Sequence, residues 1–338
     1  MARFKSINRS LDRCYRTGLK IDVEARDLKW IIFSDHHRGR RDGADDFLIC
    51  EDTYVAALNH YHQSEFSLCL LGDVEEFWEN PFITVMVKYA DVLQLEKKFY
   101  DADRLYRIWG NHDDAWKFAD TIRKHLGWLF PKIAVYESLV LNVNDEDESG
   151  EIFLVHGHQG SAESDRFSAI SKFFVKYIWR NVQRLFKIPL STPANNLKLK
   201  SQHDKAMYNW AFKNEKTLIC GHTHQPVFLS LTHEEKILRE IANIRESMEE
   251  DIRDEKIKEQ LDLLMKKVET QLANNPNADH TEKKKPCYFN TGCCSFSDGD
   301  ITGIELENKM IRLVKWDKEK KERIVLEEVS LNTVFEET

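Results

Sequence analysis

The chain has 338 residues, of which 42% are hydrophobic and 31% are charged, as is typical of a globular protein with one large domain or two. Asp and Glu outnumber Lys and Arg by 57 to 49, and the net charge of −8 makes nucleic acid an unfavourable partner. The seven cysteines lack CxxC spacing, which fits a reducing compartment. No run approaches the roughly 18 apolar residues that a membrane-spanning helix needs. We therefore expect a cytoplasmic protein.

The amino-terminal residues 1–27 are basic, and we expect them to form a helical segment ahead of the main domain. They contain no apolar core of the kind that a secretory signal has. Export is therefore not expected.

Short apolar runs recur from residue 28 onward, and several of them end in Gly, Asp, Asn or His. Five are too short and too evenly apolar for surface helices, and they are typical of strands buried on both faces. These runs lie at 29–33, 67–71, 104–109, 151–155 and 217–220. Longer segments at 45–63 and 83–103 are compatible with helices. This order predicts a layered α/β domain over residues 28–310.

Two segments interrupt the pattern and are predicted to be helical insertions. Residues 161–215 contain an aromatic and apolar stripe with basic residues opposite it, over residues 167–188. Three interpretations of the stripe stay open: core packing, a lid over an active site, or a peripheral contact with an anionic membrane. Residues 233–285 mix both charges densely, which predicts an exposed helical hairpin, with a partner-binding coiled coil as the alternative.

The last part of the chain is predicted to be mainly β-structure. Runs at 287–294, 301–309 and 310–316 have no helix between them, and the turn-like "ENK" joins the last two. We expect an antiparallel sheet here, with residues 311–338 forming a terminal strand and a tail.

Acids, amides and histidines gather directly after the five predicted buried strands. In chain order they are Asp35 and His37; Asp73; Asn111, His112 and Asp113; His156 and His158; and His222 and His224. The carboxyl ends of strands in α/β sheets form the edge at which sites are built. We therefore expect all five loops to contribute to one site.

Seven of these residues are candidate metal ligands with oxygen or nitrogen donors and no thiolate. They are Asp35, His37, Asp73, Asn111, His156, His222 and His224. A tetrahedral zinc takes four ligands, so this number predicts two cations that share a bridging carboxylate. The mixed donors suit Mn best, with Fe or Zn as alternatives. Two such ions can generate hydroxide at neutral pH and hold the oxygens of a phosphoryl group.

The motifs "DHH", "GD", "GNHD", "HGH" and "GHTH", in this order, resemble the calcineurin-like metallophosphoesterase family over roughly residues 30 to 305. The resemblance implies a β-sandwich flanked by helices. It also implies one metal held by Asp35, His37 and His224, another held by Asn111, His156 and His222, and Asp73 as the bridge. His112 would then lie beside the substrate, where it protonates the leaving oxygen or stabilises phosphoryl charge, and Asp113 would support that loop.

The segment "LLGDVEEFWEN" bears on the substrate. It lacks the Asp-Arg-Gly of phosphoprotein phosphatases, and Glu76 and Trp78 resemble the corresponding residues of UDP-2,3-diacylglucosamine diphosphatases. Those enzymes also insert lid helices where residues 161–215 stand, although they have Arg in place of His112 and lack a segment like residues 233–285. The resemblance favours a phosphorylated small molecule or a lipid-linked substrate, such as an amphiphilic nucleotide.

Taken together, the sequence predicts a dinuclear-metal hydrolase of phosphodiester or diphosphate bonds. The alternatives are a phosphomonoesterase and a non-catalytic scaffold that binds partners through residues 233–285. Arg38, Arg40 and Arg41 follow the first motif and are candidates to bind substrate phosphate, with a solvated loop as the alternative.

Overall fold

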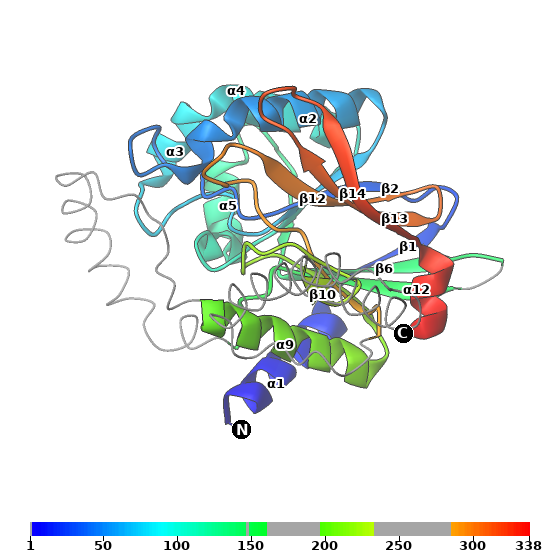
Figure 1. Ribbon diagram of the computed structural model, residues 1–338. Coiled ribbons are helices and arrows are strands. Elements are labelled where there is room, and N and C mark those ends of the chain that lie inside the picture. The colour runs from blue at the N-terminus through cyan, green and yellow to red at the C-terminus, as the bar shows by residue number, and fades with distance from the viewer. Residues whose placement is uncertain (1, 147–148, 161–196, 233–284) are drawn as a thin grey trace, which may run out of the picture.

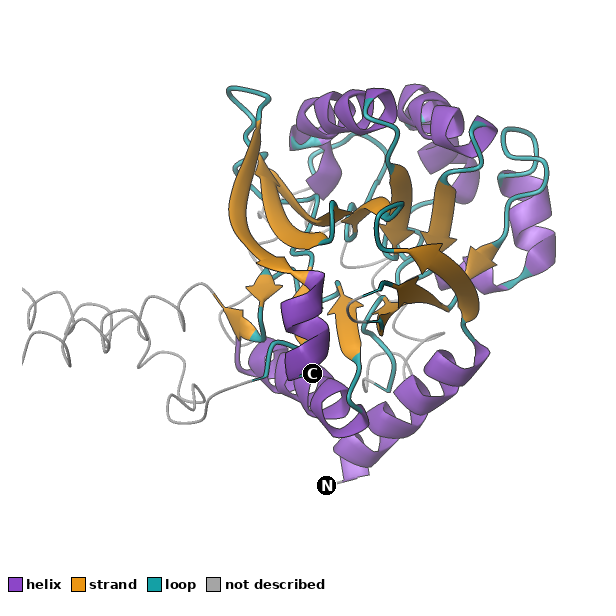
Figure 2. Cartoon of the chain, turned by 90° about the vertical axis from the view of Figure 1, so that its right-hand side faces the viewer, coloured by secondary structure: helices purple, strands orange, loops and turns teal. Residues whose placement is uncertain are grey.

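The computed structural model describes residues 2–146, 149–160, 197–232 and 285–338. Two sheets of seven strands lie face to face, and helices cover both outer faces (Figures 1 and 2). The layered α/β fold predicted from the sequence is therefore confirmed. Residues 161–196 of the predicted lid and residues 233–284 of the predicted hairpin lie outside the described residues.

One sheet combines a parallel half with an antiparallel half. Its strands in spatial order are β14 (Arg323–Ser330), β13 (Met310–Trp316), β12 (Ile301–Glu307), β2 (Lys29–Phe33), β3 (Ser67–Leu71), β4 (Leu105–Ile108) and β5 (Val135–Tyr136). β2 to β5 are parallel, and β12 to β14 are antiparallel to their neighbours. The antiparallel pairing predicted for residues 301–316 is confirmed.

The other sheet joins strands from distant parts of the chain. Their order is β1 (Leu19–Glu24), β6 (Ser138–Asn144), β7 (Gly150–Val155), β8 (Thr217–Cys220), β11 (Tyr288–Asn290), β9 (Val227–Phe228) and β10 (Leu231–Thr232). β8 is parallel to both β7 and β11. The expectation that residues 287–290 join the carboxy-terminal sheet was wrong, because Phe289 pairs with Ile219 and packs with it between the two sheets.

Both ends of the chain contain more regular structure than expected. Residues 1–27 form α1 (Ala2–Thr17) and then β1, whose sequence "LKIDVE" alternates apolar and polar residues as a half-buried strand does. The segment predicted as a tail forms β14 and α12 (Leu331–Glu337), in which Leu331 and Val334 are buried. Both ends are therefore part of the sandwich.

The remaining helices follow individual strands. They are η1 (Asp46–Ile49), α2 (Glu51–Gln63), α3 (Phe82–Lys88), α4 (Ala90–Asp101), η2 (Asp114–Lys117), α5 (Ala119–His125) and α9 (Leu197–Asn214). The two segments predicted as helices, 45–63 and 83–103, thus form η1 with α2 and α3 with α4. Among the described residues, no helix has the length and apolar character required to cross a bilayer.

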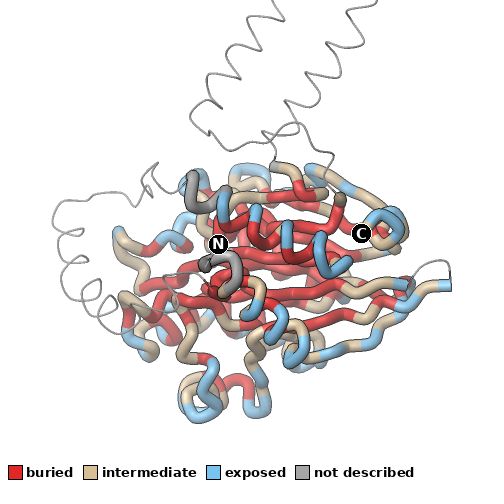
Figure 3. Tube along the Cα trace, turned by 90° about the horizontal axis from the view of Figure 1, so that it is seen from below, coloured by how far each residue is buried: buried red, intermediate tan, exposed pale blue. Residues whose placement is uncertain are grey.

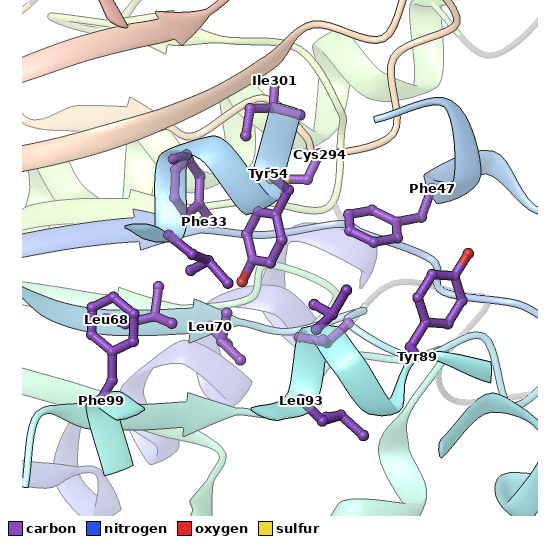
Figure 4. Close-up of a cluster of buried hydrophobic side chains, with 14 of the residues drawn as sticks. Phe33, Phe47, Tyr54, Leu68, Leu70, Tyr89, Leu93, Phe99, Cys294 and Ile301 are labelled. Atoms are coloured by element: carbon purple, nitrogen blue, oxygen red, sulfur yellow. The ribbon is translucent and has the colours of Figure 1, made fainter. Parts of the chain in front are cut away.

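The strands are evenly apolar because each of their faces packs against a different layer. On β2, Ile31 and Phe33 face α2 and α4, whereas Trp30 and Ile32 face the other sheet. Figure 4 shows Phe33 beside Tyr54 of α2 in the outer cluster. The opposite sheet packs on α1 and α9, and buried positions run along the strands (Figure 3). The chain therefore holds the strand ends on a rigid scaffold.

Candidate metal centre

The loops after β2, β3, β4, β7 and β8 meet at one edge of the sandwich. Backbone hydrogen bonds join Asp35 N to Gly72 O at 3.1 Å and Gly221 N to His156 O at 2.9 Å. His222 N also donates to Asp35 Oδ2 at 2.8 Å, which links the two sheets. The loops after β2, β3, β7 and β8, which carry six of the seven predicted ligands, are thus bonded to one another.

Asp35, His37 and His224 form one group of candidate ligands. His224 Nε2 lies 3.2 Å from Asp35 Oδ1 and 3.0 Å from His37 Nε2, and His37 Nε2 lies 3.8 Å from Asp35 Oδ1. Three donor atoms from two different sheets therefore converge on one point.

Asp73, His156 and His222 form a second group, whose donor atoms lie within 4.8 Å of one another. His156 Nδ1 donates to Leu71 O at 2.8 Å, so its Nε2 faces Asp73 Oδ2 at 3.1 Å. Asp73 Oδ2 also lies 4.0 Å from His37 Nε2 of the first group. Asp73 thus lies between the groups, where a shared ligand would be needed.

Several buried polar atoms of this site lack a hydrogen-bond partner among the described residues. They are Asp35 Oδ1, Asn111 Oδ1 and His156 Nε2. A buried polar atom without a partner costs about 1–3 kcal/mol, so three in one place require an explanation. The donors are carboxylate, amide and imidazole, the set expected for Mn, Fe or Zn. The residues present therefore fit a pair of divalent cations.

Electrostatics keep two of the candidate ligands, Asp35 and His222, in ligand form. Burial alone would raise the pKa of Asp35, but the nearby His224 and His156 outweigh it and hold that pKa well below its ordinary value. Burial, together with the neighbouring His203 and His156, lowers the pKa of His222 well below its ordinary value. Asp35 is therefore ionised and His222 neutral at neutral pH, as metal ligands must be.

The backbone at the ligands is unusual. Asp35, His37, Asp73, His222 and His224 all have positive φ values, between 51° and 71°. This conformation costs a residue with a Cβ roughly 1–2 kcal/mol. Such strain persists where the surrounding structure enforces it, and it gathers at functional sites.

His112 lies beside the first group and is oriented by two residues of the loop after β3. Its Nδ1 donates to Glu76 Oε2 at 2.5 Å, and its ring stacks on Trp78 with centroids 4.0 Å apart. Glu76 Oε2 is also 3.3 Å from His37 Nδ1. Burial would lower the pKa of His112, but the carboxylates of Glu76 and Asp73 outweigh burial and raise it. His112 therefore carries a proton more readily than a free histidine.

Asp113 accepts two backbone hydrogen bonds within the loops of the site. It accepts from Gly110 N at 2.6 Å and from Val74 N at 2.8 Å, so it joins the loops after β4 and β3. Burial and the negative charges of Asp73 and Glu75 raise its pKa. Its geometry is that of a structural support.

The three predicted phosphate-binding arginines are engaged elsewhere. Arg38 is fully buried and pairs with Glu96 beneath the site. Arg40 pairs with Asp42, and Arg41 pairs with Glu51 and donates to Lys88 O. Their guanidinium groups are thus held by carboxylates of this chain, and a contact between these arginines and substrate phosphate stays a prediction.

The buried pair continues into a second ion pair. Arg107 donates to both oxygens of Glu75 at 2.7 Å, and Trp116 Nε1 donates to Glu75 Oε2 at 2.8 Å. The backbone of Arg38 also bridges to Glu75. Arg38 follows His37 directly, and Glu75 follows Asp73 closely. The network therefore stabilises the loops after β2 and β3, which carry candidate ligands.

Sequence reasoning missed two kinds of residue. Glu76 was noted only for its spacing after Asp73, and its contact with His112 depends on a partner 36 positions away. From α9, which no motif marked, His203 reaches the loop after β7 and Asp204 reaches the loop after β8. For α9 the sequence offered no signal, because it lies inside a predicted insertion.

Solved structures with a similar arrangement have low sequence identity to this chain. A conserved uncharacterized protein of Streptococcus pneumoniae TIGR4, described as a "predicted phosphoesterase", is 15% identical with a TM-score of 0.32, over 90% of this chain and 97% of that one. Vacuolar Protein Sorting 29 of Cryptosporidium parvum is 12% identical with a TM-score of 0.37, over 90% and 98%. A cold-active protein tyrosine phosphatase is 14% identical with a TM-score of 0.37, over 98% and 85%.

A search of the curated proteins found no match. The family model for calcineurin-like phosphoesterases matches residues 28–226, which is more than half of the chain and includes every candidate ligand. The chain therefore belongs to the calcineurin-like phosphoesterase family.

Proposed function

We propose that the chain hydrolyses a phosphodiester or diphosphate bond with the help of two divalent cations. Mn is the preferred metal, and Fe and Zn are the alternatives. The observation that carries the proposal is the placement of Asp73 Oδ2, 3.1 Å from His156 Nε2 in one ligand group and 4.0 Å from His37 Nε2 in the other. Asp35, His37 and His224 would hold one cation, and Asn111, His156 and His222 the other. Bound there, such a pair supplies Lewis-acid stabilisation of phosphoryl oxygens and a nucleophile at neutral pH.

The chain's own contribution to the reaction centres on His112. With Nδ1 held by Glu76, its Nε2 is free to donate a proton to the leaving oxygen of the substrate. Trp78 fixes the plane of the ring by stacking, and Trp78 Nε1 donates to Asn111 O at 2.7 Å, so the same side chain also steadies the loop of a candidate ligand. In the proposed reaction Glu76 therefore keeps the general acid oriented and protonated.

We further propose an amphiphilic nucleotide as the substrate. Support comes from Glu76 and Trp78, whose spacing resembles that of UDP-2,3-diacylglucosamine diphosphatases, and from four exposed apolar side chains. These are Ile83 and Val87 on α3 and Phe118 and Trp128 beside α5, which are 57–66% exposed. The two helices are in contact, and Phe82 of α3 stacks on His125 of α5. The membrane contact proposed for residues 167–188 lies outside the described residues.

The test is an activity screen with Mn across bis-para-nitrophenyl phosphate, para-nitrophenyl phosphate and UDP-linked sugars, with and without detergent. We expect the diester or a diphosphate to be cleaved best, and Asp73→Ala to lower the rate by at least about 100-fold. Asp120→Ala is the matched control, because Asp120 is exposed and pairs with Arg123 at the surface. An Asp73→Ala protein with full activity would contradict the proposal.

The alternatives give different results in the same screen. A preference for the monoester would indicate a phosphomonoesterase, and no turnover together with no binding of Mn would indicate a scaffold. The complete set of seven candidate ligands, five of them buried, argues against a scaffold, because a non-catalytic chain has no need to place so many polar ligands together.

A further inference from the structure

Helix α9 brings two buried side chains to the candidate metal centre, although it belongs to none of the five motifs. His203 and Asp204 are 6% and 9% exposed. His203 Nε2 donates to Gly157 O, and its ring stands edge-on to that of His222, with centroids 5.2 Å apart. α9 therefore touches the loops after both β7 and β8.

Asp204 holds the middle of the turn formed by residues 221–224. Its Oδ1 accepts from Thr223 Oγ1 at 3.1 Å and from Tyr288 OH at 2.7 Å. Thr223 stands between His222 and His224, so a bond to its side chain restrains both histidines at once. Its backbone N also donates to Gly221 O at 2.9 Å, which closes the turn.

Asn290 of β11 completes this network from the other side. Its Nδ2 donates to Gly221 O at 2.7 Å and to Thr223 Oγ1 at 3.1 Å, and Asn290 itself is fully buried. His222 and His224 have φ values of 71° and 56°. A side chain with a Cβ keeps this conformation only when its surroundings enforce it, and Asp204, Tyr288 and Asn290 are the surroundings here.

We propose that Asp204 is a positioning residue for the metal centre, which holds the turn of residues 221–224 so that His222 and His224 face the two cations. The inference rests on the proposed function, because it concerns the same two cations. Removal of a group that hydrogen-bonds to a metal ligand and orients it typically weakens metal binding by about 10- to 100-fold. The two histidines belong to different ligand groups, so the loss of Asp204 weakens both sites.

The experiment is calorimetric titration of metal-free protein with Mn. We expect Asp204→Ala to bind Mn about 10- to 100-fold more weakly than the wild type. Tyr288→Phe removes one hydrogen-bond donor to the Asp204 carboxylate and should show a smaller loss of Mn affinity than Asp204→Ala. Asp204→Asn keeps Oδ1 as an acceptor and should bind closer to the wild type than Asp204→Ala does.

Asp12→Ala is the matched control for α9. Asp12 Oδ1 accepts from Trp210 Nε1 at 2.8 Å, so this carboxylate also anchors α9, but from the side of α1. We expect Asp12→Ala to bind Mn like the wild type. An equal loss of affinity in Asp12→Ala and Asp204→Ala would show general loosening of the helix and would overturn the inference.

The remaining outcomes separate the inference from the proposed function. A wild type that binds no Mn overturns the proposed function and the inference with it. A wild type that binds Mn, alongside an Asp204→Ala protein that binds it equally well, overturns the inference alone. If circular dichroism shows that Asp204→Ala does not fold, the Mn affinity of Tyr288→Phe is the deciding measurement. A Tyr288→Phe protein that binds Mn like the wild type would then overturn the positioning role of Asp204.

Discussion

Gly72 occupies a position in the candidate metal centre where a methyl group has no room. Its φ is +84°, and a Cβ built on it would lie 2.6 Å from both Cγ and Nδ1 of His156. That Nδ1 donates to Leu71 O at 2.8 Å, a bond that directs Nε2 of the same ring toward Asp73. The substitution Gly72→Ala should therefore strain the backbone at residue 72, displace the imidazole ring of His156 and move its ligand atom Nε2.

The expected loss of stability for Gly72→Ala follows from three contributions. The left-handed backbone costs alanine roughly 1–2 kcal/mol, and a lost hydrogen bond costs about 1 kcal/mol. The reduced freedom of the unfolded chain offsets about 0.4–1 kcal/mol. We expect the free energy of unfolding to fall by about 1–2.6 kcal/mol. Mn should bind roughly 10- to 100-fold more weakly, because His156 is turned away.

Urea denaturation and calorimetric titration with Mn measure these two effects on Gly72→Ala. Gly43→Ala is the control, because a Cβ at Gly43 meets nothing within 4 Å, and its free energy of unfolding should stay within about 0.5 kcal/mol of the wild type. A Gly72→Ala protein that unfolds and binds Mn like the wild type would refute the reasoning.

Three further results are expected. Glu76→Gln removes the carboxylate that raises the pKa of His112, so the pKa of His112 should fall. The decline of kcat/KM at high pH should then move to lower pH. An unchanged pH profile would show that His112 is not the general acid. Glu96→Gln removes the carboxylate that pairs most closely with the buried Arg38 and should lower the free energy of unfolding by about 3–5 kcal/mol. Arg123→Ala, at an exposed pair, should change that free energy by at most about 1 kcal/mol in urea denaturation. Removal of metal by chelation should lower the Tm measured by calorimetry, and equal Tm values would speak against a resident metal.

Much of the fold could be predicted because the strands carry a strong local pattern. The runs ending at Phe33, Leu71 and Cys220 are apolar on both faces, and polar side chains begin directly after each of them. Parallel strands place such ends at one edge, so the gathering of the seven candidate ligands needs no knowledge of distant contacts.

The rest depended on contacts between segments far apart in the chain. Arg38 looked like a solvated or phosphate-binding arginine, and only its buried partner Glu96, 58 positions later, decides its role. Asp204 lies in a segment expected to be a lid, and its contact with Tyr288 spans 84 positions. β1 was missed because six alternating residues next to a basic helix are a weak signal until the partner β6 is known.

The central claim is that two cations lie in this site and share Asp73. Crystals grown with Mn and measured at the Mn absorption edge would test it most directly. We expect two anomalous peaks about 3.5–4 Å apart, one beside Asp35, His37 and His224 and the other beside Asn111, His156 and His222, with Asp73 in contact with both. A single peak, or none at these residues, would contradict it.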